Sequence, residues 1–206
     1  YNDGMTKTVA CLGDSITHGL VSANYVTLLG ERFAEQDVEW INAGVDNDTT
    51  FNMLRRVDEL VPAQPDVVLI LAGTNDAIAS LSVPSYRLLQ VLTQRPTQEL
   101  AINNMREIIR YLKLTTSAMI AVLSIPPLGE ALHSRPMNSV RAYNTRLRKL
   151  ARVEGVGYLP VFERMEEVLK SEPAEGHVFK GSLWLSAEFV LLGEDFDSYS
   201  ERKGFR

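Results

Sequence analysis

The sequence has little cysteine, a deficit of positive charge and no long hydrophobic run. Its single cysteine, Cys11, excludes an internal disulfide and a cysteine-rich zinc site, so the fold must rest on a hydrophobic core. The 21 basic and 26 acidic residues leave a formal net charge of −5. This balance argues against a nucleic-acid partner, because binding phosphates requires a concentrated basic surface. No apolar run reaches the roughly 18 residues that span a bilayer, so we expect no stable insertion into a membrane.

Two local features have ordinary structural interpretations. The basic cluster in residues 141–152 is spaced like the solvated face of a helix. Cys11 lies inside an apolar run, which favours a buried, inert thiol over a nucleophile. No signal-peptide pattern opens the chain, and we expect a soluble protein that is either cytoplasmic or secreted after removal of a signal. The oligomeric state stays open.

The pattern of hydrophobic residues predicts one α/β domain over residues 1–206. Hydrophobic residues make up 45% and charged residues 23% of the chain, as in ordinary globular proteins. Apolar runs of strand length alternate with segments of helical spacing, which is typical of a parallel sheet with helices on both faces. The predicted strands are residues 8–12, 38–43, 66–72, 118–125 and 157–162. The predicted helices are residues 16–33, 49–61, 97–115 and 138–154.

Two further segments fall outside this alternation. Residues 79–96 are predicted to form a loop or short-helix insertion after the third strand, where they could line a cleft at the carboxyl end of the sheet. Residues 178–192 are rich in large apolar side chains. We interpret them as a packing element that closes the edge of the sheet, in preference to a lipid-binding surface.

Three turns with polar residues each follow one of the first three predicted strands. They are Gly13-Asp14-Ser15, residues 44–50 and Gly73-Thr74-Asn75-Asp76. In a parallel sheet such turns lie along one edge, at the carboxyl ends of the strands, where ligands bind. Gly-Asp-Ser alone is an ordinary turn that caps a helix, so the convergence of three turns is what favours a functional site.

The residue types in these turns suit acyl transfer at a serine. Such a reaction needs a nucleophile, donors for the developing oxyanion and a base for the hydroxyl proton. Ser15 can attack, and the oxyanion can be held by the backbone N–H of Ser15, a backbone N–H in the second turn and the side-chain amide of Asn75. Gly-Asp-Ser-Ile-Thr differs from Gly-x-Ser-x-Gly, so the nucleophile elbow of the α/β-hydrolases is not expected.

In order and spacing, the turns resemble the first three conserved blocks of the SGNH hydrolases, also called the GDSL esterase and lipase family. The first block is similar to Gly13-Asp14-Ser15-Ile16-Thr17-His18-Gly19, the second to residues 41–50 and the third to Gly73-Thr74-Asn75-Asp76. The helix that contains Arg141-Ala142-Tyr143-Asn144 is similar to one that precedes the last strand of family members. The resemblance covers residues 7–162 and implies a flavodoxin-like, three-layer α/β/α sandwich with a parallel five-stranded sheet.

The resemblance also implies roles for residues of this chain. Ser15 is the implied nucleophile of a carboxylic ester hydrolase, and Ser15, Asn47 and Asn75 are the implied oxyanion donors. The family usually has glycine at the position of Asn47, but asparagine tolerates left-handed backbone angles better than most residues, so its N–H can still donate. The supporting residues of the turns are Gly13, Asp14, Gly44, Gly73 and Asp76.

No cofactor or metal is expected at this site. A cluster of turn aspartates could bind a hard cation, but such residues more often cap helices or order loops. The aspartates in question are Asp14, Asp46, Asp48 and Asp76.

The sequence motif that supplies the general base in this family is absent from these 206 residues. The family carries an Asp-x-x-His motif near its C-terminus, and no Asp-x-x-His occurs in these 206 residues. His18 follows the nucleophile on the first helix, and His133 lies in the loop after the fourth strand. His177 is a weak candidate because Ala174, and not aspartate, stands three residues before it. We expect that the chain stops short of the motif and, in this form, binds an ester but turns it over poorly.

Two other functions stay open besides ester hydrolysis. A catalytically silent relative would bind a glycan, ester or protein partner in the same cleft, and the missing base and Asn47 favour this alternative. Flavodoxin-like ligand binding at the same edge is the other, and the absorbance of a flavin would reveal it. For an esterase, acetylated sugars, short-chain esters and lysophospholipids are all candidate substrates, because loops at residues 79–96 and 128–137 shape the cleft.

Overall fold

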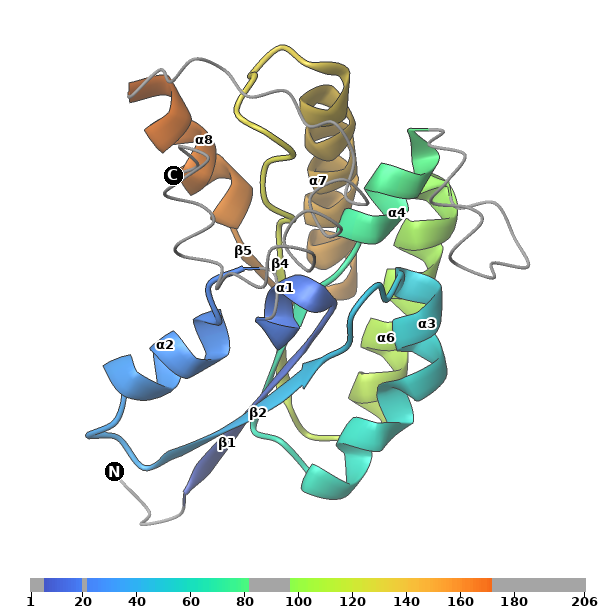
Figure 1. The fold of residues 1–206 in the computed structure, drawn as a ribbon. Coiled ribbons are helices and arrows are strands. Elements are labelled where there is room, and N and C mark those ends of the chain that lie inside the picture. Colours follow the sequence, from blue (N-terminus) through green and yellow to red (C-terminus); the bar gives the residue numbers. More distant parts are fainter. Residues whose placement is uncertain (1–5, 20–21, 82–96, 172–206) are drawn as a thin grey trace.

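Five parallel strands form one sheet in the computed structural model, which describes residues 6–19, 22–81 and 97–171 (Figure 1). The strand order across the sheet is β2-β1-β3-β4-β5, the order of flavodoxin-like folds. The strands are β1 (Lys7–Gly13), β2 (Val38–Gly44), β3 (Val67–Leu71), β4 (Met119–Leu123) and β5 (Gly157–Leu159). The predicted α/β class and the single parallel five-stranded sheet are confirmed.

The central strands are apolar because both of their faces are covered. In β1, Ala10 and Leu12 join the larger hydrophobic core, whereas Val9 and Cys11 join a smaller cluster on the opposite face. Burial raises the pKa of the Cys11 thiol to about 11, in agreement with the predicted buried thiol. The edge strands β2 and β5 contain no fully buried residue, because each has only one neighbouring strand.

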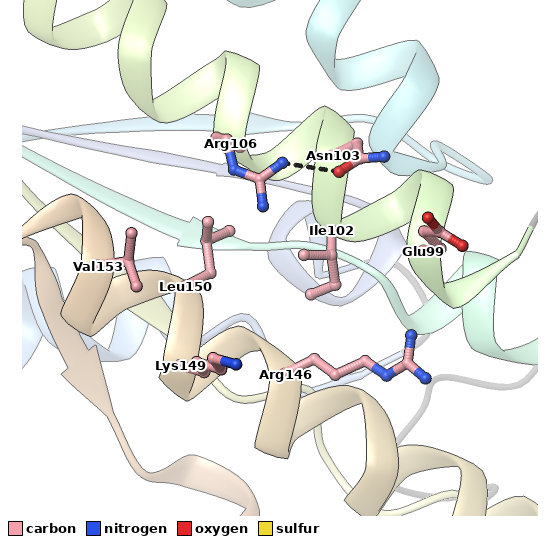
Figure 2. Close-up of a pocket in the computed structure, with 8 residues that line it drawn as sticks. All are labelled: Glu99, Ile102, Asn103, Arg106, Arg146, Lys149, Leu150 and Val153. Carbon is pink, nitrogen blue, oxygen red and sulfur yellow. Dashed lines mark hydrogen bonds between the residues drawn. The ribbon is translucent and has the colours of Figure 1, made fainter.

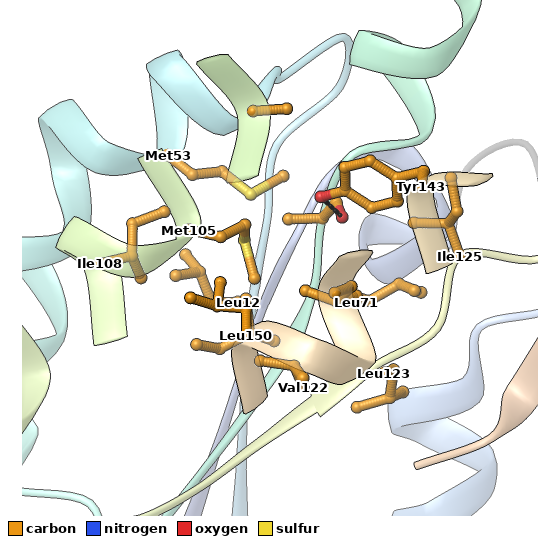
Figure 3. Close-up of a cluster of buried hydrophobic side chains, with 14 of the residues drawn as sticks. Leu12, Met53, Leu71, Met105, Ile108, Val122, Leu123, Ile125, Tyr143 and Leu150 are labelled. Carbon is orange, nitrogen blue, oxygen red and sulfur yellow. Dashed lines mark hydrogen bonds between the residues drawn. The ribbon is translucent and has the colours of Figure 1, made fainter. Parts of the chain in front are cut away.

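Helices cover both faces of the sheet, which makes the three layers of the fold. Figure 1 shows α2 (Tyr25–Arg32) and α8 (Val161–Ser171) on one side and α3 (Thr50–Arg56), α6 (Gln98–Thr115) and α7 (Arg135–Glu154) on the other. The larger core lies between the second group and the sheet, where side chains such as Met53, Met105 and Ile108 pack against Leu12 and Val122 (Figure 3). Within the described helices, none is long and apolar enough to cross a membrane.

The amphipathic pattern predicted for α7 agrees with its burial. The apolar stripe of Val140, Tyr143, Leu147, Leu150 and Ala151 is buried. Arg146, Arg148 and Lys149 are exposed on the opposite face, as expected of a solvated basic cluster.

The single helix predicted over residues 16–33 is wrong. Two helices occupy this range, α1 (Ser15–His18) and α2. Gly19, with φ of 85°, ends α1 in the left-handed conformation that glycine adopts readily. Asn24 then caps α2 by accepting a hydrogen bond of 3.1 Å from the backbone N–H of Thr27. The break leaves α1 as a single turn at the end of β1.

Other element boundaries also differ from the predicted ones. The helix predicted over residues 49–61 is divided into α3 and a 3-10 helix, η1 (Val57–Ala63), in which Pro62 lacks the N–H for an α-helical bond. The strand predicted over residues 157–162 ends at Leu159, since Pro160 has no N–H for the ladder and the next residue begins α8. α7 begins three residues before the predicted start, because Ser134 caps it.

Two predicted features lie wholly or mostly outside the described residues. Of the insertion predicted over residues 79–96, Ala79 and Ser80 belong to α4 (Thr74–Ser80), and residues 82–96 are not described. The packing element at residues 178–192 and the candidate base His177 are not described either.

Candidate active site

The carboxyl ends of β1, β2 and β3 lie side by side at one edge of the sheet. Gly13 at the end of β1 pairs in register with Gly44 of β2 and with Leu71 of β3. The backbone N–H of Val45 donates to the carbonyl of Gly13 over 3.1 Å, which ties the first turn to the second. The three polar turns identified in the sequence therefore meet at this edge.

Ser15 is placed by the turn that follows β1. Asp14 is the N-cap of α1, and its Oδ1 accepts a hydrogen bond of 3.0 Å from the backbone N–H of Ile16. Ser15 is thus the first residue of the helix and is half-buried. Among the residues that the structure describes, its hydroxyl has no hydrogen-bond partner, so it is available to a ligand.

Asn47 lies in a left-handed turn of the backbone. The N–H of Asp48 donates to the carbonyl of Val45 over 3.3 Å, which closes a four-residue turn with Asn47 as its third member. At φ of 64°, Asn47 has the positive angle that this position favours and that glycine or asparagine adopts most readily. Asparagine in place of the family's glycine is therefore compatible with the same backbone course.

Asn75 is held in the first turn of α4. Its side-chain amide nitrogen donates to the carbonyl of Asp48 over 2.8 Å, so the third turn is bonded to the second. Gly73 precedes the helix at φ of 114°, and any side chain there would overlap the ring of Tyr143. The Tyr143 hydroxyl donates to the carbonyl of Ala72 over 2.9 Å, which fixes α7 against the same turn.

Asp76 links α4 to the start of α3. Its two carboxylate oxygens accept hydrogen bonds from Thr50, one from the backbone N–H at 2.9 Å and one from the hydroxyl at 2.8 Å. The Asn104 amide also donates to the Thr50 hydroxyl over 3.1 Å. Because all three side chains are buried, these bonds hold the second and third turns at a constant separation.

Arg56 at the end of α3 bonds both of the first two turns. Its Nη2 donates to the carbonyl of Gly13 over 3.0 Å, and its Nη1 donates to the carbonyl of Ala43 over 3.1 Å. Its Nε donates to Oδ2 of Asp48 over 2.6 Å in a salt bridge with little exposure to water. The guanidinium therefore lies at the junction of β1, β2 and the turn of Asn47.

The buried carboxyl of Asp14 has an unusual electrostatic environment. Burial, and to a smaller extent the neighbouring charges of Asp76 and Asp48, raise its pKa to about 7, although the hydrogen bond from Ile16 acts in the opposite direction. Its Oδ2 is buried and has no hydrogen-bond partner among the described residues. Burial also raises the pKa of Asp76 and that of Asp48, where the salt bridge with Arg56 partly offsets the effect.

Three of the four turn aspartates bond to side chains of other protein residues. Asp76 binds Thr50 and Asp48 binds Arg56, as described, and Oδ1 of Asp46 lies 2.9 Å from Nδ1 of His18. Within the described ranges, no group of three or more His, Cys, Asp or Glu side chains is arranged to hold a metal ion.

Neither histidine in the described residues forms a hydrogen bond with the Ser15 side chain. His18 lies one turn after Ser15 on α1, and its ring is half-exposed and paired with Asp46. His133 is exposed in the segment between β4 and α7. The general base therefore stays unassigned, with His177 outside the described residues.

A pocket elsewhere on the surface is not part of this site. A cavity of about 340 Å³ lies between α6 and α7 (Figure 2). Its walls are formed by Glu99, Ile102, Asn103, Arg106, Arg146, Lys149, Leu150 and Val153. None of these residues belongs to the three turns, so the chemistry of the turns gives this cavity no role.

Several residues that order the site were not identified from the sequence. Arg56 stands beside the exposed Arg55 and is indistinguishable in the pattern from a solvated helix face. The pairing of Asp46 with His18 could not be predicted from the sequence, because 28 residues separate the two. Tyr143 is polar within an apolar stripe, and that was a usable signal for a buried hydrogen bond.

Comparison with known proteins gives one match to a family and several to solved structures. The sequence profile of the GDSL-like lipase/acylhydrolase family matches residues 11–178. An arylesterase of Vibrio mimicus is 35% identical in an alignment of 79 residues, with 35% of this chain and 40% of that protein covered. The chain thus spans less than half of the length of this curated relative.

The similar structures have low sequence identity and support the fold alone. An α/β hydrolase enzyme, LAE5, from the metagenome of Lake Arreo, Spain, has a TM-score of 0.67 and 20% identity, with 81% of this chain and 82% of that chain covered. A variant of the acetyl xylan esterase Axe2 from Geobacillus stearothermophilus has a TM-score of 0.65 and 18% identity, with 81% of each chain covered. With a profile match over residues 11–178, more than half of its length, the chain belongs to the GDSL-like lipase/acylhydrolase family.

Proposed function

We propose that this chain is a serine esterase that cleaves a carboxylic ester through an acyl-enzyme at Ser15. The observation that carries the proposal is that the turns of Ser15, Asn47 and Asn75 meet at one edge of the sheet and are joined there by hydrogen bonds. An unengaged serine hydroxyl beside fixed N–H donors is the arrangement that acyl transfer requires.

The proposed reaction assigns a role to each turn. The Ser15 oxygen attacks the carbonyl carbon of the ester while its proton passes to a general base, which stays unassigned here. The carbonyl oxygen becomes an oxyanion, and the N–H groups of Ser15 and Asn47 and the Asn75 amide donate to it. The tetrahedral intermediate then collapses, its bond to the alkoxy oxygen breaks, and the base returns the proton to that oxygen so that the alcohol leaves. The ester that remains on Ser15 is hydrolysed by water to the acid and free enzyme.

Asn75 suits this role because its amide has two N–H bonds. One donates to the carbonyl of Asp48 and fixes the orientation of the side chain. The other is left for the substrate, and it needs no reorganisation as charge develops.

The names of two similar proteins suggest which ester to test first. One is named an arylesterase and the other an acetyl xylan esterase. p-Nitrophenyl acetate is both an aryl ester and an acetyl ester, so we propose it as the first probe.

A catalytically silent binding module is the second candidate function. The observation in its favour is the absence of an Asp-x-x-His sequence from the 206 residues. Without a base, a serine hydroxyl is a weak nucleophile, and the same cleft would bind an ester, glycan or protein partner without turnover.

Labelling with a fluorophosphonate separates the two candidates. An esterase should be modified once per chain, and mass spectrometry of the digested protein should place the phosphonyl group on Ser15. The heat-denatured chain is the control, since it keeps the serine but loses the donors. Absence of modification in the folded full-length protein would contradict the esterase and favour the binding module.

Replacement of Asn75 by alanine tests the oxyanion hole. We expect kcat for p-nitrophenyl acetate to fall by about 10²-fold or more with little change in KM, because the lost donor acts on charge that develops only in the transition state. Asn103→Ala, an exposed amide on α6, is the matched control and should retain kcat. An unchanged kcat in Asn75→Ala would remove Asn75 from this role.

A further inference from the structure

The planar guanidinium of Arg56 donates three hydrogen bonds to three different acceptors. The acceptors are the carbonyls of Gly13 and Ala43 and the carboxylate of Asp48, at 3.0, 3.1 and 2.6 Å. Only 15% of the Arg56 side chain is exposed, and 10% of that of Asp48. An ion pair so removed from water resists screening by salt and is more rigid than a surface pair.

Two of the three acceptors, Gly13 and Asp48, lie within two residues of a proposed oxyanion donor. Gly13 lies two residues before Ser15, and Asp48 directly follows Asn47. The carbonyl of Asp48 also accepts the hydrogen bond from the Asn75 amide. The guanidinium is therefore connected to all three donors, through one or two residues of backbone in each case.

The geometry requires arginine in particular. Three acceptors around one centre need donors that point in different directions within a plane, which the guanidinium provides. A lysine at position 56 keeps the positive charge but has a tetrahedral ammonium group that cannot reproduce this fork.

We propose that Arg56 is a positioning residue of the oxyanion hole, which sets the separation between the N–H of Ser15 and the donors of Asn47 and Asn75. This inference rests on the proposed esterase function. Arg56 itself bonds only the carbonyls of Gly13 and Ala43 and the carboxylate of Asp48, and it does not bond the hydroxyl of Ser15. Its effect on the reaction is transmitted through the backbone of the first two turns.

The test is Arg56→Lys, with Arg55→Lys as the matched control. Arg55 is the adjacent, exposed residue whose guanidinium lies 5.9 Å from the centre of the Phe51 ring. Both variants are assayed with p-nitrophenyl acetate, and kcat is normalised to the number of sites that a fluorophosphonate labels. For Arg56→Lys we expect kcat per labelled site to fall by about 10²-fold, with KM within about 3-fold, because a small displacement of donors acts on the transition state. Arg55→Lys should match the parent chain.

Inhibition by phenylboronic acid gives a second readout that a purely structural role would not change. The boronate forms a tetrahedral anion on Ser15, so its inhibition constant should rise in Arg56→Lys in parallel with the loss of kcat. If kcat per labelled site and the inhibition constant both stay unchanged while the melting temperature falls, Arg56 serves stability alone and the proposal is wrong.

Asp48→Asn keeps the test decisive if Arg56→Lys does not fold. It retains an oxygen for the Nε of Arg56 but removes the negative charge. We expect kcat per labelled site to fall by about 10-fold, and an unchanged value would contradict the proposal.

Failure of the proposed esterase function would give a different result in these experiments. If Ser15 of the full-length parent protein is not labelled at all, the esterase proposal is wrong, and so is this inference.

Discussion

Replacing Ser15 with alanine in the complete protein is expected to abolish hydrolysis of p-nitrophenyl acetate and to leave the fold intact. The change removes only the hydroxyl that would form the acyl-enzyme, and kcat should fall by at least about 10³-fold. Because this hydroxyl has no hydrogen-bond partner among the described residues, the melting temperature should stay close to that of the parent chain. Initial rates and a thermal melt of both proteins provide the measurement.

The control for this experiment is Ser117→Ala. Ser117 is exposed and precedes β4 at the opposite end of the sheet, so its replacement should change neither rate nor stability. If Ser15→Ala retains turnover, another group attacks the ester and Ser15 is not the nucleophile. If the rate is lost together with the melting transition, Ser15 has a structural role that its contacts do not suggest.

The stability of the protein is expected to fall as the pH rises from about 4 to about 7, and Asp14→Asn should remove much of this dependence. Burial is the main cause that raises the pKa of Asp14 from 3.8 to about 7. Below the lower value the carboxyl is protonated in both the folded and the unfolded state. Between the two values the unfolded chain releases the proton while the folded protein keeps it, so the free energy of unfolding falls as pH rises.

The magnitude follows from the size of the shift. At about 1.4 kcal/mol per pKa unit, ionised Asp14 costs the folded state about 4 kcal/mol above pH 7. Between about pH 5 and pH 8, the parent chain should lose about 3 kcal/mol more of its unfolding free energy than Asp14→Asn does. The asparagine oxygen can still accept from the N–H of Ile16, so the cap of α1 is retained.

Urea unfolding at a series of pH values measures this difference. Asp76 and Asp48 also have raised pKa values and are present in both proteins. Because their charges interact with that of Asp14, the difference between the two profiles reports Asp14 together with this interaction. Asp58→Asn, which changes an exposed carboxyl on η1, is the control and should follow the pH profile of the parent chain. Parallel profiles for the parent chain and Asp14→Asn would contradict a raised pKa.

The pattern of the sequence alone was sufficient for the class of fold and for the placement of the three turns at one edge of the sheet. Strand and helix periodicities are local, and parallel strands place their carboxyl ends at one edge whatever the details of packing. Gly13-Asp14-Ser15 and Gly73-Thr74-Asn75-Asp76 could therefore be assigned to the same edge before any contact was known. The left-handed angle of Asn47 agrees with the glycine that the family usually has at this position, because asparagine also tolerates this angle.

The tertiary structure decided which side chains hold the turns together. Arg56 binds Gly13 across 43 residues, and Tyr143 binds the carbonyl of Ala72 across 71. Contacts over such separations depend on the strand order and on how helices pack across the sheet, which no local pattern encodes. The division of the first predicted helix at Gly19 was also missed: glycine commonly ends helices, but the apolar spacing continues beyond it. Residue type and spacing thus determined where the chemistry is expected, while packing between distant elements determined the geometry of its donors.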